Sequence, residues 1–408
     1  MNRLRLTFLG DALCNPLVLA AHGTAAGGHD FRPVFAPLRD CLADSDFVVA
    51  NLETPLSESG GDLTNERWRF NSPRAYAEAL RWAGVDFVTT ANNHCLDRGT
   101  AGIAATVRVL DAVGLPHTGT FADPGAAAVP CVAEAAGFRL GLLSYTYGTN
   151  AFSNGVYLRP DEDFMVNLFQ DQELSGPLAR AWAADRLSPE GRAYEQMERR
   201  RWPENLTLPV YERIEPFAAR RERFAADVAR LRAAAPDFVA LGMHAGGQYN
   251  PRATARTREL ASFAQACGVD FVAGTHEHLV HGGDFSRLGE GRLATYCLGD
   301  LASCTGLWSE IPEGETPRLA RFSIAWHIDL ERAVPGGAAR VAGSSFTVLV
   351  RRKGDAVGRL SVHPATELWR SMPHGAERDA LANDIRAVAD CFAGRPFADE
   401  PVADEYAL

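Results

Sequence analysis

Residues 86–99 read Asp-Phe-Val-Thr-Thr-Ala-Asn-Asn-His-Cys-Leu-Asp-Arg-Gly and join a short apolar run to a group of polar side chains. The run at residues 87–90 is rich in aromatic and β-branched side chains, which is typical of a buried strand. The tripeptide Asp-Phe-Val also opens runs at residues 46, 237 and 270, without the fixed period of an internal repeat. Similar runs occupy residues 4–9, 140–144 and 294–298. The chain is therefore expected to contain a series of buried strands.

Helical patterns separate these strands. Apolar stripes with the spacing of an α-helix lie within residues 76–83, 103–110 and 260–267, and glycines at positions 84, 114 and 268 follow them. Alternating strands and helices are typical of a largely parallel sheet with right-handed crossovers. We therefore predict an α/β fold.

The expected domain organisation is one core interrupted by an insertion. We expect residues 1–149 and 226–310 to form the two halves of the core. Residues 311–408 should complete the fold with strands at 322–330 and 345–351 and a helix at 380–391. Residues 150–225 break the rhythm and carry Trp182, Trp202 and the basic cluster Arg199–Arg201. This helical insertion is either a lid over the site or a solvated excursion, and its sequence favours neither.

The composition limits the classes of partner. Of the 408 residues, 46% are apolar and 23% are charged, as in an ordinary globular protein. The formal net charge of −10 argues against nucleic acid or anionic lipid as a partner, although bound metal ions could still attract a small anionic substrate. There is no run of about 18 apolar residues that would predict a membrane span. The eight cysteines include no C-x-x-C pair, so we expect a reduced, cytoplasmic setting. The oligomeric state is not predicted.

Polar groups follow the ends of five predicted strands. The carboxyl ends of strands in an open α/β sheet line one crevice, so these groups are expected to converge. Each alone has a structural explanation, such as a helix cap, a turn or a buried histidine, but together they favour a metal site. The residues are Asp11, Glu53, Asn93, His94, His244, His276 and His278.

The chemical types of these residues also indicate a reaction. Carboxylate, amide and imidazole groups together suit divalent ions such as manganese, zinc or iron. Two neighbouring ions can hold a substrate oxygen and generate hydroxide near neutral pH. A histidine beside the ions can protonate the leaving group. The pattern therefore predicts a hydrolase with two divalent metal ions.

The same residues resemble a known family. In order and spacing they are similar to poly-γ-glutamate capsule-synthesis proteins of the CapA type, which belong to the calcineurin-like metallophosphatase superfamily. The resemblance covers residues 4–301 without the insertion. The motifs that carry it are Gly10-Asp11, Asn51-Leu52-Glu53, residues 91–99, residues 243–246, residues 274–278 and Leu298-Gly299-Asp300.

The resemblance implies a four-layer αββα metallophosphatase-like sandwich with a dinuclear site in its crevice. In such a site Glu53 would bridge the two ions, and His94 would be the unbound acid or transition-state stabiliser. One ion would also bind Asn93, His244 and His276, and the other would bind Asp11 and His278.

The chain departs from the family pattern at two positions. The superfamily's first motif is Asp-x-His, whereas position 13 here is Leu13, so one ion lacks a histidine unless Cys14 or Asn15 helps. Many members end the last motif with Leu-Gly-Asn, whereas this chain has Asp300, which could tune the site or cap a turn. Many capsule-synthesis members also carry a membrane anchor, and this sequence shows none.

Other polar residues are candidates for substrate contact. Arg69 and Arg98 could clamp an anionic group, although a surface salt bridge is the slightly favoured explanation for Arg98. Asn51 lies in the second motif, and Tyr145 ends a predicted strand near the crevice, so both are expected to contact substrate. We expect His281 to be an exposed loop histidine, and the less favoured alternative is that it supports the metal ligands from behind.

Two classes of function remain open at this stage. The first is a metal-dependent hydrolase that cleaves a phosphoester or amide bond of a small anionic or γ-glutamyl compound. The second is a non-catalytic accessory protein of poly-γ-glutamate synthesis with a degenerate site, which the missing histidine at position 13 favours. A weaker third alternative is a binding protein that contacts its ligand without metal.

Overall fold

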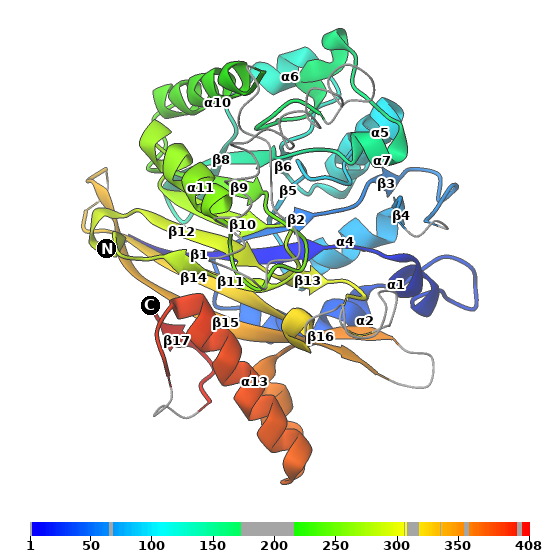
Figure 1. Ribbon diagram of the computed structural model, residues 1–408, viewed down its shortest axis with the longest axis vertical. Coiled ribbons are helices and arrows are strands. Elements are labelled where there is room, and N and C mark those ends of the chain that lie inside the picture. The colour runs from blue at the N-terminus through cyan, green and yellow to red at the C-terminus, as the bar shows by residue number, and fades with distance from the viewer. Residues whose placement is uncertain are drawn as a thin grey trace, which may run out of the picture.

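The computed structural model describes residues 2–64, 68–172, 216–305, 307, 318–334, 336–354, 359–397 and 402–408 (Figure 1). The described chain forms a nine-stranded sheet, a six-stranded sheet and a two-stranded pair. The six-stranded sheet has the order β11-β12-β10-β9-β8-β7. Its strands are β7 (Val132–Ala135), β8 (Phe138–Thr146), β9 (Phe238–His244), β10 (Phe271–Thr275), β11 (Val280–Asp284) and β12 (Leu293–Leu298).

The nine-stranded sheet follows the order β16-β15-β14-β1-β2-β5-β6, with β13 paired to β1 and β17 paired to β15. Its strands are β1 (Asn2–Ala12), β2 (Phe47–Leu52), β5 (Phe87–Thr89), β6 (His117–Thr118), β13 (Asp300–Ala302), β14 (Phe322–Arg332), β15 (Ala339–Lys353), β16 (Leu360–Pro364) and β17 (Tyr406–Ala407).

The predicted α/β class is confirmed. Parallel strands form one side of the nine-stranded sheet and the centre of the six-stranded sheet. Strands β1, β2, β5 and β6 pair in parallel, as do β8, β9, β10 and β12. Strands β14, β15 and β16 are antiparallel and extend the nine-stranded sheet beyond β1. Parallel neighbours need crossover connections, and the helical stripes of the sequence provide them.

Three hydrophobic clusters show how the sheets and helices pack. Because successive strand residues face opposite sides, Leu6 and Phe8 of β1 share one cluster with Phe238 of β9 and Phe271 of β10, between the sheets. On the other side of the nine-stranded sheet, helices α4 (Arg74–Ala83) and α5 (Gly99–Val113) pack against β2 and β5. Helices α10 (Pro216–Ala233) and α11 (Ala255–Cys267) pack against β8, β9 and β10 (Figure 1).

Shorter elements fill the connections. None of the described helices is both long and apolar enough to cross a membrane. The remaining helices are α1 (Pro16–Ala21), α2 (Arg32–Phe35), α3 (Arg39–Leu42), α6 (Pro124–Ala128), α7 (Ala151–Asn154), α12 (Ala365–Ser371) and α13 (Ala376–Ala393). The 3-10 turns are η1 (Ala36–Leu38), η2 (Pro160–Met165), η3 (Leu288–Glu290) and η4 (Arg318–Arg321), and β3 (Leu56–Ser57) pairs with β4 (Ser72–Pro73).

The expected insertion is described only in part. Its first residues form α7 and η2, and bridges from Val166 to Thr120 and from Leu168 to Thr146 attach this segment to the core. The expected end of the insertion, residue 225, falls inside α10. Trp182, Trp202 and Arg199–Arg201 lie outside the described residues, so the lid remains a prediction.

Candidate metal centre

Strand pairing brings the first motifs together. Asp11 on β1 lies in register with Asn51 on β2 and with Asp300 on β13. Gly10 allows β1 to lie close to the segment before β13, because a Cβ at this position would be 1.7 Å from the carbonyl oxygen of Gly299. That same carbonyl accepts a hydrogen bond of 3.0 Å from the Asp11 amide. The strand ends therefore converge as the sequence pattern predicts.

One group of side chains, called here the Glu53 cluster, consists of Glu53, His244 and His276. Their ligand atoms all lie within 4.8 Å of one another, and all three residues are buried. His244 Nε2 is 3.4 Å from Glu53 Oε1 and 2.8 Å from the amide oxygen of Asn93. The rings of His244 and His276 are 4.7 Å apart. Four of the predicted ligands are thus gathered around one point.

Some polar atoms of the Glu53 cluster have no hydrogen-bond partner among the described residues. They are both carboxylate oxygens of Glu53 and Nδ1 of His276, and all three atoms are buried. Burial and the nearby charge of Asp11 raise the pKa of Glu53 well above its usual value. Burial and neighbouring imidazoles lower the pKa values of His244 and His276 well below the usual value. Lone pairs held in this way fit a divalent cation, because buried polar groups are otherwise almost always paired.

The backbone of the His-x-His motif is strained. His276 has φ of 100° and His278 has φ of 59°, in the left-handed region that side chains other than glycine rarely adopt. The amide of His276 donates a hydrogen bond of 2.9 Å to Asp11 Oδ2, which helps to hold this conformation. Strain of this kind gathers at functional sites, where the surrounding structure over-determines it.

A second group, called here the Asp11 cluster, consists of Asp11, His278 and Asp300, again with ligand atoms within 4.8 Å. His278 Nδ1 lies 2.7 Å from Asp300 Oδ1, and Asn51 donates to Asp11 Oδ1 at 2.6 Å. Burial raises the pKa of Asp11 to about 6. Burial lowers the pKa of His278 and the Asp300 carboxylate raises it, with a net increase.

Asp300 belongs to the Asp11 cluster but is not one of the metal ligands predicted from the sequence. The sequence indicates it only through the motif Leu298-Gly299-Asp300, which differs from the Leu-Gly-Asn of many family members. The residues considered as substitutes for the histidine missing at Leu13 lie elsewhere. Cys14 packs in the apolar cluster with α4, and the side-chain oxygen of Asn15 accepts a hydrogen bond of 2.9 Å from the Cys304 amide.

His94 is held by a carboxylate. Its Nδ1 lies 2.8 Å from Asp97 Oδ2, which also accepts a hydrogen bond of 2.7 Å from the Phe70 amide. Asn154 of α7 donates to the other oxygen of Asp97 at 2.8 Å. The Phe70 ring lies 4.3 Å from the His94 ring. The first turn of the expected insertion therefore helps to fix the predicted catalytic histidine.

The candidate substrate residues occupy different places. Asn51 lies in the centre, where it contacts Asp11 and approaches His244 at 3.3 Å. The guanidinium of Arg98 donates to the carbonyls of Phe70 and Arg69, at 3.2 and 3.3 Å. Arg69 in turn donates to the carbonyl of Asp97 at 3.1 Å. Both arginines therefore brace the loop beside His94, and substrate contact by either one stays a prediction.

Tyr145 is not brought to the site. Its ring packs 5.1 Å from Phe169 and 4.9 Å from Phe224, in the cluster under α10 and α11, and its hydroxyl contacts Asp227. Tyr147, two residues further along the chain, lies with its ring 4.5 Å from that of His276. The position of Tyr145 at a strand end indicates that it lies near the metal centre, but it does not indicate on which face of the sheet the side chain lies.

The expectation of an exposed His281 is wrong. His281 is buried, with Nε2 donating to the Asn250 carbonyl at 2.6 Å and Nδ1 in contact with Glu277. The other oxygen of Glu277 accepts a hydrogen bond of 2.9 Å from the Gly247 amide. This network ties the loop after β9 to the strained His-x-His segment.

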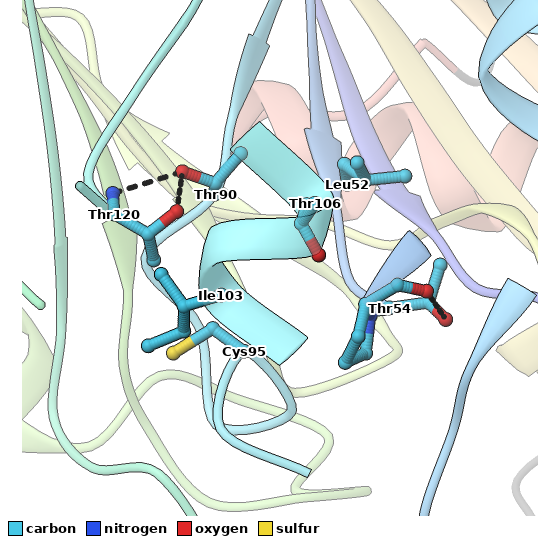
Figure 2. Close-up of a pocket in the computed structure, with 8 residues that line it drawn as sticks. Leu52, Thr54, Thr90, Cys95, Ile103, Thr106 and Thr120 are labelled. Atoms are coloured by element: carbon cyan, nitrogen blue, oxygen red, sulfur yellow. Dashed lines mark hydrogen bonds between the residues drawn. The ribbon is translucent and has the colours of Figure 1, made fainter. Parts of the chain in front are cut away.

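A small cavity is lined in part by Cys95, the residue that follows His94 in the chain (Figure 2). Its volume is about 10 Å³, which is the space of a single water molecule. Thr120 donates from its amide and hydroxyl to the Thr90 hydroxyl, at 3.0 and 2.8 Å. Substrate does not fit in this cavity. The lining residues include Leu52, Thr54, Cys95, Ile103 and Thr106.

Comparison with known proteins identifies the family. The family model described as bacterial capsule synthesis protein PGA_cap matches residues 5–305. The chain belongs to this family. The resemblance found in the sequence is thereby confirmed, and a metallophosphatase-like protein is consistent with it.

Two curated relatives come from Sinorhizobium fredii (strain NBRC 101917 / NGR234), and both are described as uncharacterized proteins. One, y4sH, is 30% identical over 132 residues, which cover 30% of this chain and 27% of the relative. The other, y4uA, is 29% identical over 138 residues, which cover 31% of this chain and 28% of the relative. The matched part of the chain thus spans little more than a quarter of either relative.

Proposed function

We propose that the protein is a metal-dependent hydrolase that cleaves a phosphoester or amide bond of a small anionic substrate, with γ-glutamyl compounds among the candidates. The observation that carries the proposal is the Glu53 cluster, where two carboxylate oxygens and one imidazole nitrogen are buried with no hydrogen-bond partner in the described part of the chain. We also propose that the two sheets and their outer helices form the four-layer αββα sandwich of metallophosphatase-like proteins.

The chain's own residues divide into metal-holding and proton-handling groups. Glu53, His244, His276 and Asn93 would hold one divalent ion, and the Asp11 cluster offers a second position. When bound, such an ion would polarise a substrate oxygen and activate a water molecule. Manganese, zinc and iron all suit this donor set, which mixes carboxylate, amide oxygen and imidazole.

His94 would supply the proton for the leaving group. Asp97 accepts from Nδ1, and this hydrogen bond fixes the orientation and the tautomer of the ring. Nε2 is then the nitrogen that takes up a proton and passes it to the leaving group. Burial of His94 and its contact with Phe70 exclude water from one side of the ring. A positioned histidine of this kind typically accelerates a reaction by about 10²–10⁴-fold.

One observation favours a second candidate function. Leu13 stands where the superfamily motif has a histidine, which removes one imidazole from the Asp11 cluster. A non-catalytic accessory protein in poly-γ-glutamate synthesis would tolerate that loss. Such a protein would not depend on His94.

The test is hydrolysis by the metal-reconstituted protein. After addition of manganese or zinc, turnover would be measured with p-nitrophenyl phosphate, bis-p-nitrophenyl phosphate and γ-glutamyl-p-nitroanilide. We expect metal-dependent cleavage of at least one probe, a loss of about 10²–10⁴-fold in His94→Ala, and no change in the exposed control His374→Ala. Absence of metal-dependent turnover, or equal turnover by both variants, would count against the hydrolase and favour the accessory function.

A further inference from the structure

A fully buried arginine reaches the metal centre from outside the family match. Arg351 lies on β15, beyond residues 5–305, and its side chain is 0% exposed. Its Nη1 lies 3.4 Å from Asp300 Oδ2 and donates to the Ser303 carbonyl at 2.8 Å. Its Nη2 contacts the Ala320 carbonyl. A permanent positive charge therefore stands directly behind the Asp11 cluster.

The two clusters differ in how far their polar atoms are satisfied. Within the described ranges, three polar atoms of the Glu53 cluster have no hydrogen-bond partner. In the Asp11 cluster every carboxylate oxygen has a polar partner. Asp11 accepts from Asn51 Nδ2 and from the His276 amide, and Asp300 contacts His278, the Ser303 hydroxyl and Arg351.

The second carboxylate gives the Asp11 cluster no advantage in net charge over the Glu53 cluster, because Arg351 lies beside it. Glu53 brings a negative charge to its cluster, and neither histidine of that cluster has a fixed charge to offset it. The Asp11 cluster holds two carboxylates, but Arg351 offsets one of them. Leu13 also removes one imidazole that would otherwise favour an ion there. A cation brought to the Asp11 cluster would meet the repulsion of a guanidinium a few ångströms away.

We propose that Arg351 takes over part of the electrostatic role of the second metal ion. The protein then holds one ion tightly at the Glu53 cluster and a second ion, at the Asp11 cluster, at least about tenfold more weakly. This inference rests on the metal centre of the proposed function. It assigns Asp300 as the link between Arg351 and His278, and so as a positioning residue for that imidazole.

The competing explanation is that Asp300 replaces the missing histidine as a direct ligand. In that case the second position would be as strong as the first. Removing the charge of Arg351 would then not tighten it selectively. The two explanations therefore differ in a binding measurement that does not depend on activity.

The experiment is a titration of the metal-stripped protein with manganese or zinc, with ion stoichiometry and affinity measured by calorimetry and mass spectrometry. The variants are Arg351→Met, which removes the charge, and Arg351→Lys, which keeps it. The matched control is Arg352→Met, because Arg352 is exposed and follows on the same strand, where its side chain faces the other side.

We expect one tight ion in the wild type and a second at least about tenfold weaker. Arg351→Met should tighten the second ion about tenfold or more and leave the first unchanged. Arg351→Lys and Arg352→Met should resemble the wild type. Two ions of equal affinity in the wild type, or equal effects of methionine and lysine at position 351, would overturn the inference.

A second variant keeps the inference testable if Arg351→Met does not fold. Asp300→Asn leaves the guanidinium without its carboxylate, so binding of the second ion should be lost while the first ion is retained. An unchanged second ion in Asp300→Asn would overturn the inference. A wild type that binds no ion at all would instead contradict the proposed function.

Discussion

Replacement of Glu53 by methionine is expected to stabilise the metal-free protein and to abolish its stabilisation by metal. Glu53 is 0% exposed, and no residue that the structure describes forms a hydrogen bond with either of its carboxylate oxygens. The carboxylates of Asp11, Asp300 and Asp97 add unfavourable charge. An unsatisfied buried polar group costs about 1–3 kcal/mol, and methionine has a similar length without polar oxygens. Glu53→Met should therefore gain roughly that free energy of unfolding in the absence of metal.

With metal present, the wild type should become more stable to unfolding than Glu53→Met. A ligand that binds only the folded state at 100 times its Kd adds about 2.7 kcal/mol to the free energy of unfolding. We expect the wild type to show this gain with manganese or zinc, and Glu53→Met to show none. The assay is urea unfolding at one fixed pH, with chelator or with metal, followed by circular dichroism.

A surface glutamate supplies the control. Glu78 has a side chain that is 52% exposed and pairs with Arg74, so Glu78→Met should change the stability by less than about 0.5 kcal/mol in either condition. If Glu53→Met were less stable than the wild type in chelator, Glu53 would have a stabilising partner in the metal-free protein. That result would refute the reasoning from unpartnered atoms.

Three further predictions concern single side chains outside the two clusters. Asn154→Ala should lower the turnover number about tenfold with unchanged metal content, because the amide that holds Asp97 is lost; steady-state kinetics and mass spectrometry would check this. Tyr145→Phe should leave KM unchanged, because the hydroxyl contacts Asp227 away from the site; a raised KM would restore Tyr145 as a substrate residue. Burial lowers the pKa of His327 from 6.5 to about 4, so the unfolded chain takes up the proton first and stability falls as pH drops through this window. The loss should reach at most about 3 kcal/mol, and acid unfolding of His327→Gln should lack it.

The sequence predicted those parts of the fold that depend on local pattern. Residues 47–50, 87–90 and 238–241 fall almost wholly within β2, β5 and β9, because short apolar runs between polar residues have few other solutions. The stripes at 76–83, 103–110 and 260–267 lie within α4, α5 and α11, each of which ends at a glycine with positive φ. Strand ends also placed the main polar groups together, since parallel strands share one edge.

The rest depended on pairing between distant segments. The contact of Arg351 with Asp300 requires β15, β14, β1 and β13 to lie in one sheet, and no local pattern near Arg351 indicates that order. Tyr145 shows a second limit. Its neighbour Ser144 accepts a hydrogen bond of 3.1 Å from the Ala91 amide, whereas Tyr145 points to the opposite face. A shift of one residue along a strand reverses the face, and the strand end alone does not fix it.

The most direct test of the metal centre is the metal content of the protein purified without chelator, measured by mass spectrometry on the wild type and on Glu53→Ala. The account predicts at least one tightly held divalent ion per chain in the wild type and its loss in the variant. A wild type without metal even after manganese or zinc is added, or a variant that keeps its ion, would contradict it.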